Sequence, residues 1–300
     1  MKVFLGSALM LCLLGTFLSC NGKNMVAANA MAPTTAAVFE PDVRFASIDT
    51  LAEFMADEIS AKTIDEFVNR YEQQAVAIKS YGCLNHGGED ENLLDKTVCG
   101  DLRALADRLS GGSTFDMVMC GCIYCAVYHY LTAKYYCEQY SASPLYQAEM
   151  RDWLALEDEL GGLYGDLSYL TIWGGSLARI TASGSMWALA EIRENDYSKL
   201  HSEGSFNTCT LKTLACAREN LLQELAAARS IDGYEEGMYN GEGYKALRQQ
   251  VCDRADRVAV LLDKWLASRA QLCEAEDIPE SHTTNLVARL GAQLIEIIKE

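Results

Sequence analysis

The sequence predicts an all-α protein, and three observations support this prediction. Only four of its 300 residues are proline, and runs of β-branched residues are short. The alternation of apolar and polar residues that marks half-buried strands is absent. Glycines occur where helices should end, at Gly111-Gly112, Gly161-Gly162, Gly174-Gly175 and Gly241-x-Gly243. Because half of the residues are hydrophobic, these helices have enough apolar surface for a sizeable core.

The first twenty residues have the layout of a bacterial lipoprotein signal peptide. Lys2 precedes an uncharged run over residues 3–18, and the small residue Ser19 stands directly before Cys20. The run is shorter than the roughly 20 apolar residues that span a membrane. We therefore expect cleavage before Cys20, lipidation of Cys20 and a place in the bacterial cell envelope. The alternative is ordinary secretion with cleavage after Ala30.

Behind the leader (residues 1–19), residues 20–43 are rich in Ala, Thr, Asn and Pro, which predicts a flexible tether. An N-terminal helical segment is expected over 44–112. Within it, Thr50 and Thr63 each stand three residues before a glutamate at the start of an apolar run, the pattern of a capping box. Further helices are predicted at about 91–109, 115–140, 145–171, 176–200, 209–229, 243–273 and 284–298.

The cysteine count favours disulfides over metal thiolates. Of twelve cysteines, Cys12 would leave with the leader and Cys20 would carry lipid, which leaves an even number in an exported chain. The cluster Cys120-Gly-Cys122-Ile-Tyr-Cys125 is spaced like zinc ligands, but no second Cys-x-x-Cys pair stands at a suitable distance. We therefore predict disulfide-stapled helices, of unspecified pairing, and neither a metal nor a cofactor.

The acidic composition limits the possible partners. The chain has a formal charge of −17, and removal of Lys2 with the leader makes it one unit more negative. Such a charge repels nucleic acid and anionic lipid headgroups, so membrane contact is expected through the N-terminal lipid only. It favours encounter with basic proteins, although high solubility alone is the simpler interpretation of this charge.

No catalytic residues are predicted. Glu157, Asp158 and Glu159 offer neighbouring carboxylates of the kind that glycosidases use, but adjacent helical residues point in different directions. No sequence pattern brings a nucleophile, a base and an orienting group together. An enzyme with a carboxylate site is kept as an alternative.

One order of motifs resembles a known family. The chain reads Met119-Cys120, then Trp153-Leu-Ala-Leu-Glu-Asp158, a Gly-Gly-Ser turn, and later an arginine. This order resembles the LprI-type lysozyme-inhibitor family of small helical envelope domains. In that family, a cysteine-bearing helix leads to a helix with Trp-x-x-x-Arg-Asp-x-x-Cys, a Gly-Gly-Ser turn and a last helix with an arginine. The matching residues are Cys120, Trp153, Asp158, Gly174, Gly175, Ser176 and Arg193; the departures are Glu157 for the arginine, Gly161 for the cysteine and Ser185 for a later cysteine.

A second, more diverged copy follows. Trp-Leu-Ala recurs at Trp265, which supports an internal repeat at domain-length spacing. The residues that fit the pattern are Cys209, Cys216, Trp265, Arg269 and Cys273, whereas Ala270 replaces the Asp and the glycine turn is missing. The two LprI-like units are predicted at 113–203 and 206–300. We expect their motif residues to be mainly structural, with the tryptophans in the core and Cys273 bridged to Cys209 or Cys216.

The resemblance implies an envelope-anchored protein that binds a basic lysozyme-type muramidase and blocks its activity. The alternative is an envelope assembly protein without catalytic function. The segment 231–243 is acidic, aromatic and rich in glycine, so its residues Tyr234, Glu235, Glu236 and Tyr239 form a candidate binding loop. A plain connector is the competing interpretation of this segment.

Overall fold

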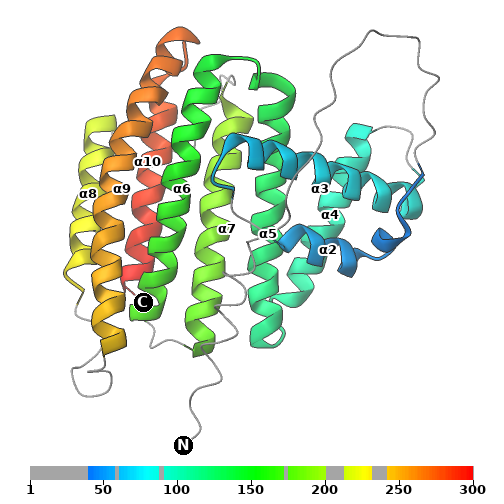
Figure 1. Ribbon diagram of the computed structural model, residues 1–300, viewed down its shortest axis with the longest axis horizontal. Coiled ribbons are helices and arrows are strands. Elements are labelled where there is room, and N and C mark those ends of the chain that lie inside the picture. The colour runs from blue at the N-terminus through cyan, green and yellow to red at the C-terminus, as the bar shows by residue number, and fades with distance from the viewer. Residues whose placement is uncertain are drawn as a thin grey trace, which may run out of the picture. The chain divides into compact units, whose positions relative to one another are not determined.

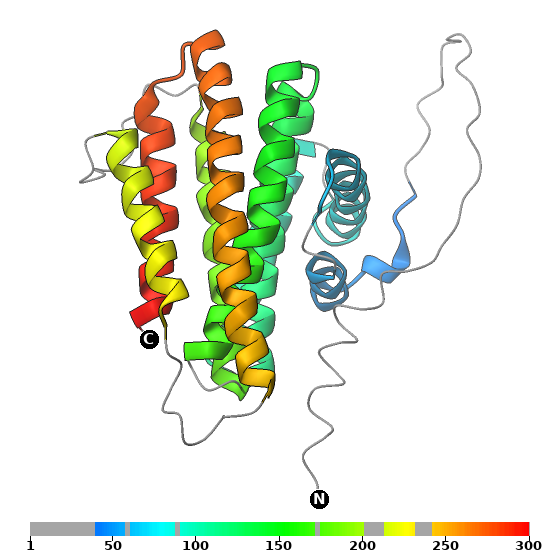
Figure 2. The ribbon, with the colours of Figure 1, turned by 60° about the vertical axis from the view of Figure 1, so that its left-hand side comes forward.

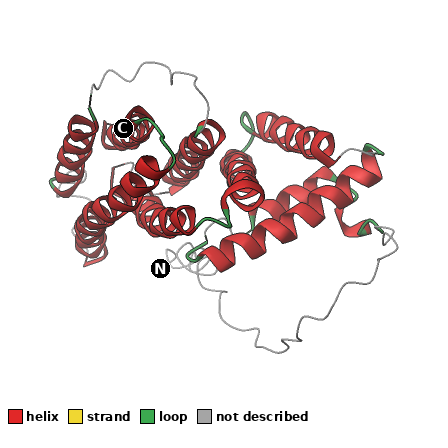
Figure 3. Cartoon of the chain, turned by 90° about the horizontal axis from the view of Figure 1, so that it is seen from above, coloured by secondary structure: helices red, strands yellow, loops and turns green. Residues whose placement is uncertain are grey.

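The computed structural model describes residues 40–57, 61–87, 91–171, 175–200, 213–231 and 242–299. Throughout these residues the chain forms helices joined by loops and no strand, as Figure 3 shows, which confirms the predicted all-α class. None of the described helices carries an apolar stretch long enough to cross a membrane. The leader, the predicted tether up to residue 39, and Cys20 lie outside the described residues.

The N-terminal segment consists of a 3₁₀ turn η1 (Val43–Phe45) and helices α2 (Ile48–Ala56), α3 (Ile64–Asn85) and α4 (Glu91–Leu109). Thr63 caps α3, because its hydroxyl accepts from the backbone N–H of Glu66. The other half of the predicted capping box does not form, since the Glu66 carboxylate accepts from the N–H of Lys62 at 2.8 Å. The predicted cap at Thr50 is wrong. Ser47 caps α2 by accepting from the N–H of Thr50, which itself lies within the first helical turn. Ser is the better N-cap of the two residue types, which is consistent with a helix that begins after Ser47.

Six long helices follow, and their bounds agree with the predicted ranges to within a few residues wherever they are described. They are α5 (Thr114–Tyr135), continued by the π-helical turn η2 (Tyr136–Tyr140), α6 (Pro144–Thr171), α7 (Gly175–Lys199), α8 (Leu214–Arg229), α9 (Glu242–Ala275) and α10 (Glu280–Lys299). Ser113 begins α5 with a full capping box, in which its hydroxyl accepts from the N–H of Asp116 and the Asp116 carboxylate accepts from the N–H of Ser113.

The long helices pack in the same way in both halves of the bundle (Figures 1 and 2). Helices α5 and α7 run parallel, with Gly121 against Ser183 and Tyr124 stacked on Trp187. Helices α8 and α10 also run parallel and in contact. Between these pairs, α6 and α9 lie antiparallel along each other. Helix α3 runs across the direction of the long helices, as both views show.

The two predicted LprI-like units share one hydrophobic core. The largest apolar cluster takes buried side chains from α6, α7, α8, α9 and α10, and the rings of Trp153 and Trp265 meet edge to face at 5.4 Å inside it. A second cluster joins α2, α3 and α4 to α5. Helix α5 contributes to both clusters, through Tyr130 to the second and through Ala133 to the first. The N-terminal segment is therefore packed onto the bundle through α5.

The predicted disulfide staples are not borne out among the nine described cysteines, all of which are free thiols. Cys120 and Cys125 are buried on α5, and their spacing of five residues turns them to different faces of the helix. Cys216 on α8 is exposed, whereas the sulfur of Cys273 lies 3.7 Å from the Thr283 hydroxyl. Its other predicted partner, Cys209, lies outside the described residues.

Candidate functional site

The polar residues of the bundle core lie on stripes that helical periodicity creates. On α6, Glu149, Trp153 and Glu157 follow one another at intervals of four, so they share one face. On α9, Trp265 and Arg269 have the same spacing. Because α6 and α9 pack antiparallel, the two stripes meet in the middle of the bundle, and α7 adds Arg193 from one side.

Glu149 is the centre of this network and is completely buried. Its two carboxylate oxygens accept from the Arg193 guanidinium at 2.9 and 2.6 Å, which is a bidentate pair. One oxygen also accepts from the indole N–H of Trp265 at 2.7 Å. The Arg269 guanidinium lies 3.4 Å from the same oxygen, and the Tyr197 hydroxyl 3.4 Å from the other.

Asp196 completes the charge balance. It accepts from Arg193 at 3.0 Å and from Arg269 at 2.6 Å, so two buried guanidiniums face two buried carboxylates. Burial by itself would raise the pKa of Glu149, but Arg193 and Arg269 hold that pKa below its usual value. The network is therefore ionised and neutral as a whole, which is the condition under which buried charges are tolerated.

Aromatic rings enclose the network. The guanidinium carbon of Arg193 lies 4.4 Å from the ring centre of Trp153 and 4.4 Å from that of Tyr197. Both tryptophans and both arginines are among the most deeply buried side chains of the described chain. The arrangement removes water around the ion pairs and strengthens each of them.

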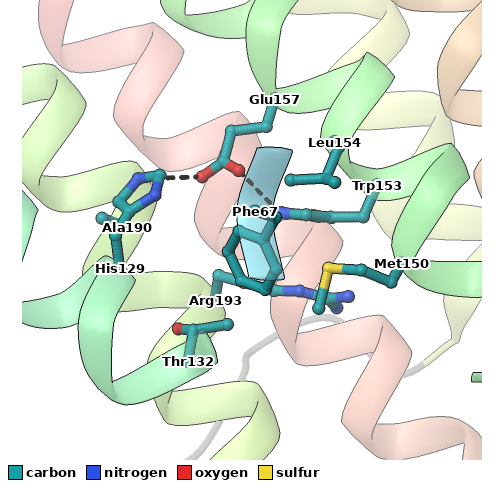
Figure 4. A pocket seen from close by; sticks show the side chains of 9 residues that line it. All are labelled: Phe67, His129, Thr132, Met150, Trp153, Leu154, Glu157, Ala190 and Arg193. Carbon is teal, nitrogen blue, oxygen red and sulfur yellow. Dashed lines mark hydrogen bonds and ion pairs between the residues drawn. The ribbon is translucent and has the colours of Figure 1, made fainter. Parts of the chain in front are cut away.

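A second polar pair lies one turn further along α6 (Figure 4). Glu157 accepts from the Trp153 indole N–H at 3.2 Å, and its other oxygen lies 3.4 Å from Nε2 of His129 on α5. Burial raises the pKa of Glu157 to about 7, against the opposing influence of Arg193 and of the Trp153 hydrogen bond. Burial also lowers the pKa of His129 to about 3.

Four of the residues that the family pattern singled out meet in this network: Trp153, Arg193, Trp265 and Arg269. The other described ones do not. Asp158 pairs with Lys62 at 3.6 Å, Cys120 belongs to the second apolar cluster, and Cys216 is exposed. Gly175 adopts a φ of +76° ahead of Ser176 at the start of α7. The candidate binding loop (Tyr234, Glu235, Glu236, Tyr239), Gly174 and Cys209 lie outside the described residues.

The structure accounts for two departures from the family pattern. A Cβ atom at Gly161, where the pattern has a cysteine, would lie 2.5 Å from the sulfur of Met186, so α6 and α7 approach closely there. Glu157, in the place of the arginine, faces His129 instead of a carboxylate. The three consecutive acids diverge, since Asp158 pairs with Lys62 and Glu159 with Arg254 and Arg257.

Sequence reasoning missed the carboxylates of the network. Glu149 stands four residues before Trp153 and Asp196 three residues after Arg193, so each lies on the same helix face as a motif residue. That spacing was a usable signal, because a charged residue inside a buried stripe needs a partner of opposite charge.

The network joins α6, α7 and α9 through ion pairs and hydrogen bonds inside the core. Its charged groups pair with one another inside the core, although Nε of Arg193 has no hydrogen-bond partner in the described chain. The adjoining cavity has a volume of about 10 Å³, roughly the space of one water molecule, and is too small for a substrate. Among the described residues, no three His, Cys, Asp or Glu side chains converge to hold a metal ion. No protein-family model, curated protein or solved structure matches this chain. The resemblance to the LprI-type family therefore stays a prediction.

Proposed function

We propose that this chain is an envelope-anchored binding protein that resembles the LprI-type lysozyme inhibitors and captures a basic, lysozyme-type muramidase. Arg193 and Arg269, the arginines that the family pattern singled out, are used inside the core, so a partner meets other side chains. The proposal therefore depends on what the surface offers.

The observation that carries the proposal is an acidic turn between α9 and α10. Glu274, Glu276, Asp277 and Glu280 are all exposed there, and none forms an ion pair with a cation of the described chain. Asp277 takes a φ of 53°, which lets the chain reverse within a few residues. We name this set, residues 274–280, the acidic turn.

The acidic turn lies close to tyrosine rings at the same end of the bundle. The charge of Glu276 contributes to raising the pKa of Tyr140, after the larger effect of burial, and Tyr140 stacks on Tyr146 at 4.4 Å. Tyr146 itself is buried, so the partly exposed ring is that of Tyr140. Carboxylates beside a partly exposed aromatic ring suit the recognition of a basic protein surface, because the charges speed association and the ring supplies contact area.

The test is calorimetric binding of the full-length protein to hen-type and goose-type lysozymes at low and high salt, with muramidase activity read in parallel. The variant Glu274→Gln/Glu276→Gln/Asp277→Asn should weaken binding by roughly tenfold or more at low salt, since complementary charges act mainly on the association rate. The control Glu53→Gln/Glu219→Gln/Glu296→Gln removes the same number of exposed charges elsewhere and should bind as the parent does. If lysozyme binding weakened equally in both variants, the acidic turn would act only through the net charge of the protein.

The second candidate is an envelope assembly protein. It is favoured by two large apolar side chains at the N-terminal ends of the parallel helices α5 and α7, where Phe115 is 72% exposed and Leu177 58% exposed. Absence of lysozyme binding at both salt concentrations would contradict the inhibitor proposal and make this candidate the better one.

A further inference from the structure

Two small cavities lie on either side of His129, beneath α3. The first is bounded by Phe67 of α3 together with Trp153, Glu157 and Arg193 of the bundle, as Figure 4 shows. The second is bounded by Phe67, Arg70, Tyr71 and Gln74 of α3 and by Ala133 of α5. Each measures about 10 Å³, roughly the space of one water molecule. Helix α3 thus covers a polar site.

The cavities carry more hydrogen-bonding capacity than the protein uses. Four buried polar atoms around them have no hydrogen-bond partner in the described chain: Gln74 Nε2, His129 Nε2, Thr132 Oγ1 and Arg193 Nε. The nearest acceptor is Glu157, whose oxygen lies 3.4 Å from His129 Nε2. A proton on either partner would turn this approach into a hydrogen bond between carboxyl and imidazole.

The charged groups around Glu157 do not neutralise it on their own. From α7, Arg193 already faces Glu149 and Asp196. From α3, Arg70 donates to the backbone oxygen of Asp57. On α6 itself the neighbour is another acid, Asp158, which is paired with Lys62, and from α5 the neighbours are the His129 imidazole and the buried thiol of Cys125.

We propose that Glu157 holds a single buried proton against the neutral His129 imidazole, and that the opposite titrations of these two groups keep the docking of α3 on the bundle nearly independent of pH. Helix α3 forms the lid over both groups, through Phe67 and Gln74. When α3 lifts away, both groups meet water and return to ordinary ionisation. The equilibrium between closed and lifted α3 is therefore linked to protons at both residues.

The two linkages have opposite signs. The raised pKa of Glu157, about 7, means that this carboxyl holds its proton more tightly when α3 is closed than when α3 is lifted. Glu157 alone therefore favours lifting of α3 as the pH rises. The lowered pKa of His129, about 3, means that its imidazole takes up a proton less readily when α3 is closed than when α3 is lifted. His129 alone therefore favours lifting of α3 as the pH falls. Between pH 5 and pH 9 the two dependences largely cancel.

The experiment is hydrogen exchange of the α3 amides in the full-length protein at pH 6 and pH 9, corrected for intrinsic exchange rates. In His129→Gln, lifting should increase about tenfold from pH 6 to pH 9, because only Glu157 remains. In Glu157→Gln, it should decrease about fourfold over the same interval, because only His129 remains. In the parent and in the double variant it should change less than about threefold.

The proposal would be overturned if lifting of α3 changed in the same direction between pH 6 and pH 9 in both single variants. It would also be overturned if lifting in the parent protein increased with pH as steeply as in His129→Gln. Amides of α8 and α10 serve as an internal reference, since these helices are remote from the site and should show no such slopes. A titration of the His129 imidazole in the parent by NMR gives a second test that needs no variant. The ring should stay neutral down to about pH 4, and protonation near pH 6.5 would contradict the proposal.

Discussion

The substitution Glu149→Gln tests the buried network most directly. It keeps the shape of the side chain but removes the charge that faces Arg193 and Arg269. Asp196 then remains as the only carboxylate for two buried guanidiniums, and the bidentate pair at 2.9 and 2.6 Å is lost. Breaking a buried pair by removal of one partner costs about 3–5 kcal/mol, because it leaves an uncompensated charge in the core. We expect this loss in the free energy of unfolding.

Urea unfolding followed by circular dichroism measures the effect, and Asp263→Asn is the matched control. Asp263 forms an equally well-aligned bidentate pair with Arg218, at 2.7 and 2.8 Å, but on the surface. Its removal should cost less than about 1 kcal/mol, since exposed pairs contribute little. Similar losses in the two variants would refute the argument that burial makes the network important.

The pH dependence of the same variant has a defined sign. Arg193 and Arg269 hold the pKa of Glu149 below its unfolded value, so its stabilisation is present above the unfolded pKa of about 4.3 and is lost as the pH falls through the lower folded value. Glu149→Gln should therefore lose less stability than the parent on acidification.

Three further substitutions test packing and hydrogen bonding, each by urea unfolding. Gly121→Ala should lower the free energy of unfolding by roughly 1–3 kcal/mol, since the new Cβ would lie 2.7 Å from the Ser183 hydroxyl and 3.0 Å from its backbone carbon. Gly165→Ala, where no atom lies within 4 Å of the new Cβ, should instead stabilise the helix by up to about 1 kcal/mol, and a loss there would contradict the packing argument. Trp265→Phe keeps a ring in the core but removes the N–H that donates to Glu149, so we expect a loss of about 1–3 kcal/mol; an unchanged stability would show that this hydrogen bond is dispensable.

The helical part of the fold was predictable because its signals are local. Helical periodicity, caps and terminal glycines depend on residues a few positions apart, and they located the long helices to within a few residues. The cap of α2 was misplaced by three residues because Ser47 and Thr50 are both good caps. The disulfides were a different kind of prediction. An even cysteine count says nothing about which helix faces the cysteines occupy.

In the polar core, the tryptophans and arginines were singled out beforehand, whereas the carboxylates that pair with them were not. The sequence alone determined the all-α class and the repeated Trp-Leu-Ala segments, because these are properties of composition and spacing. The two arginines were singled out only by the resemblance to the LprI-type family. Only the tertiary structure decided that both predicted units share one core, and that Glu149 of the first unit faces Trp265 and Arg269 of the second. It also decided that Glu157 meets His129 beneath α3. Each contact joins residues far apart in the chain, and its partners are set by how whole helices pack, which no local pattern records.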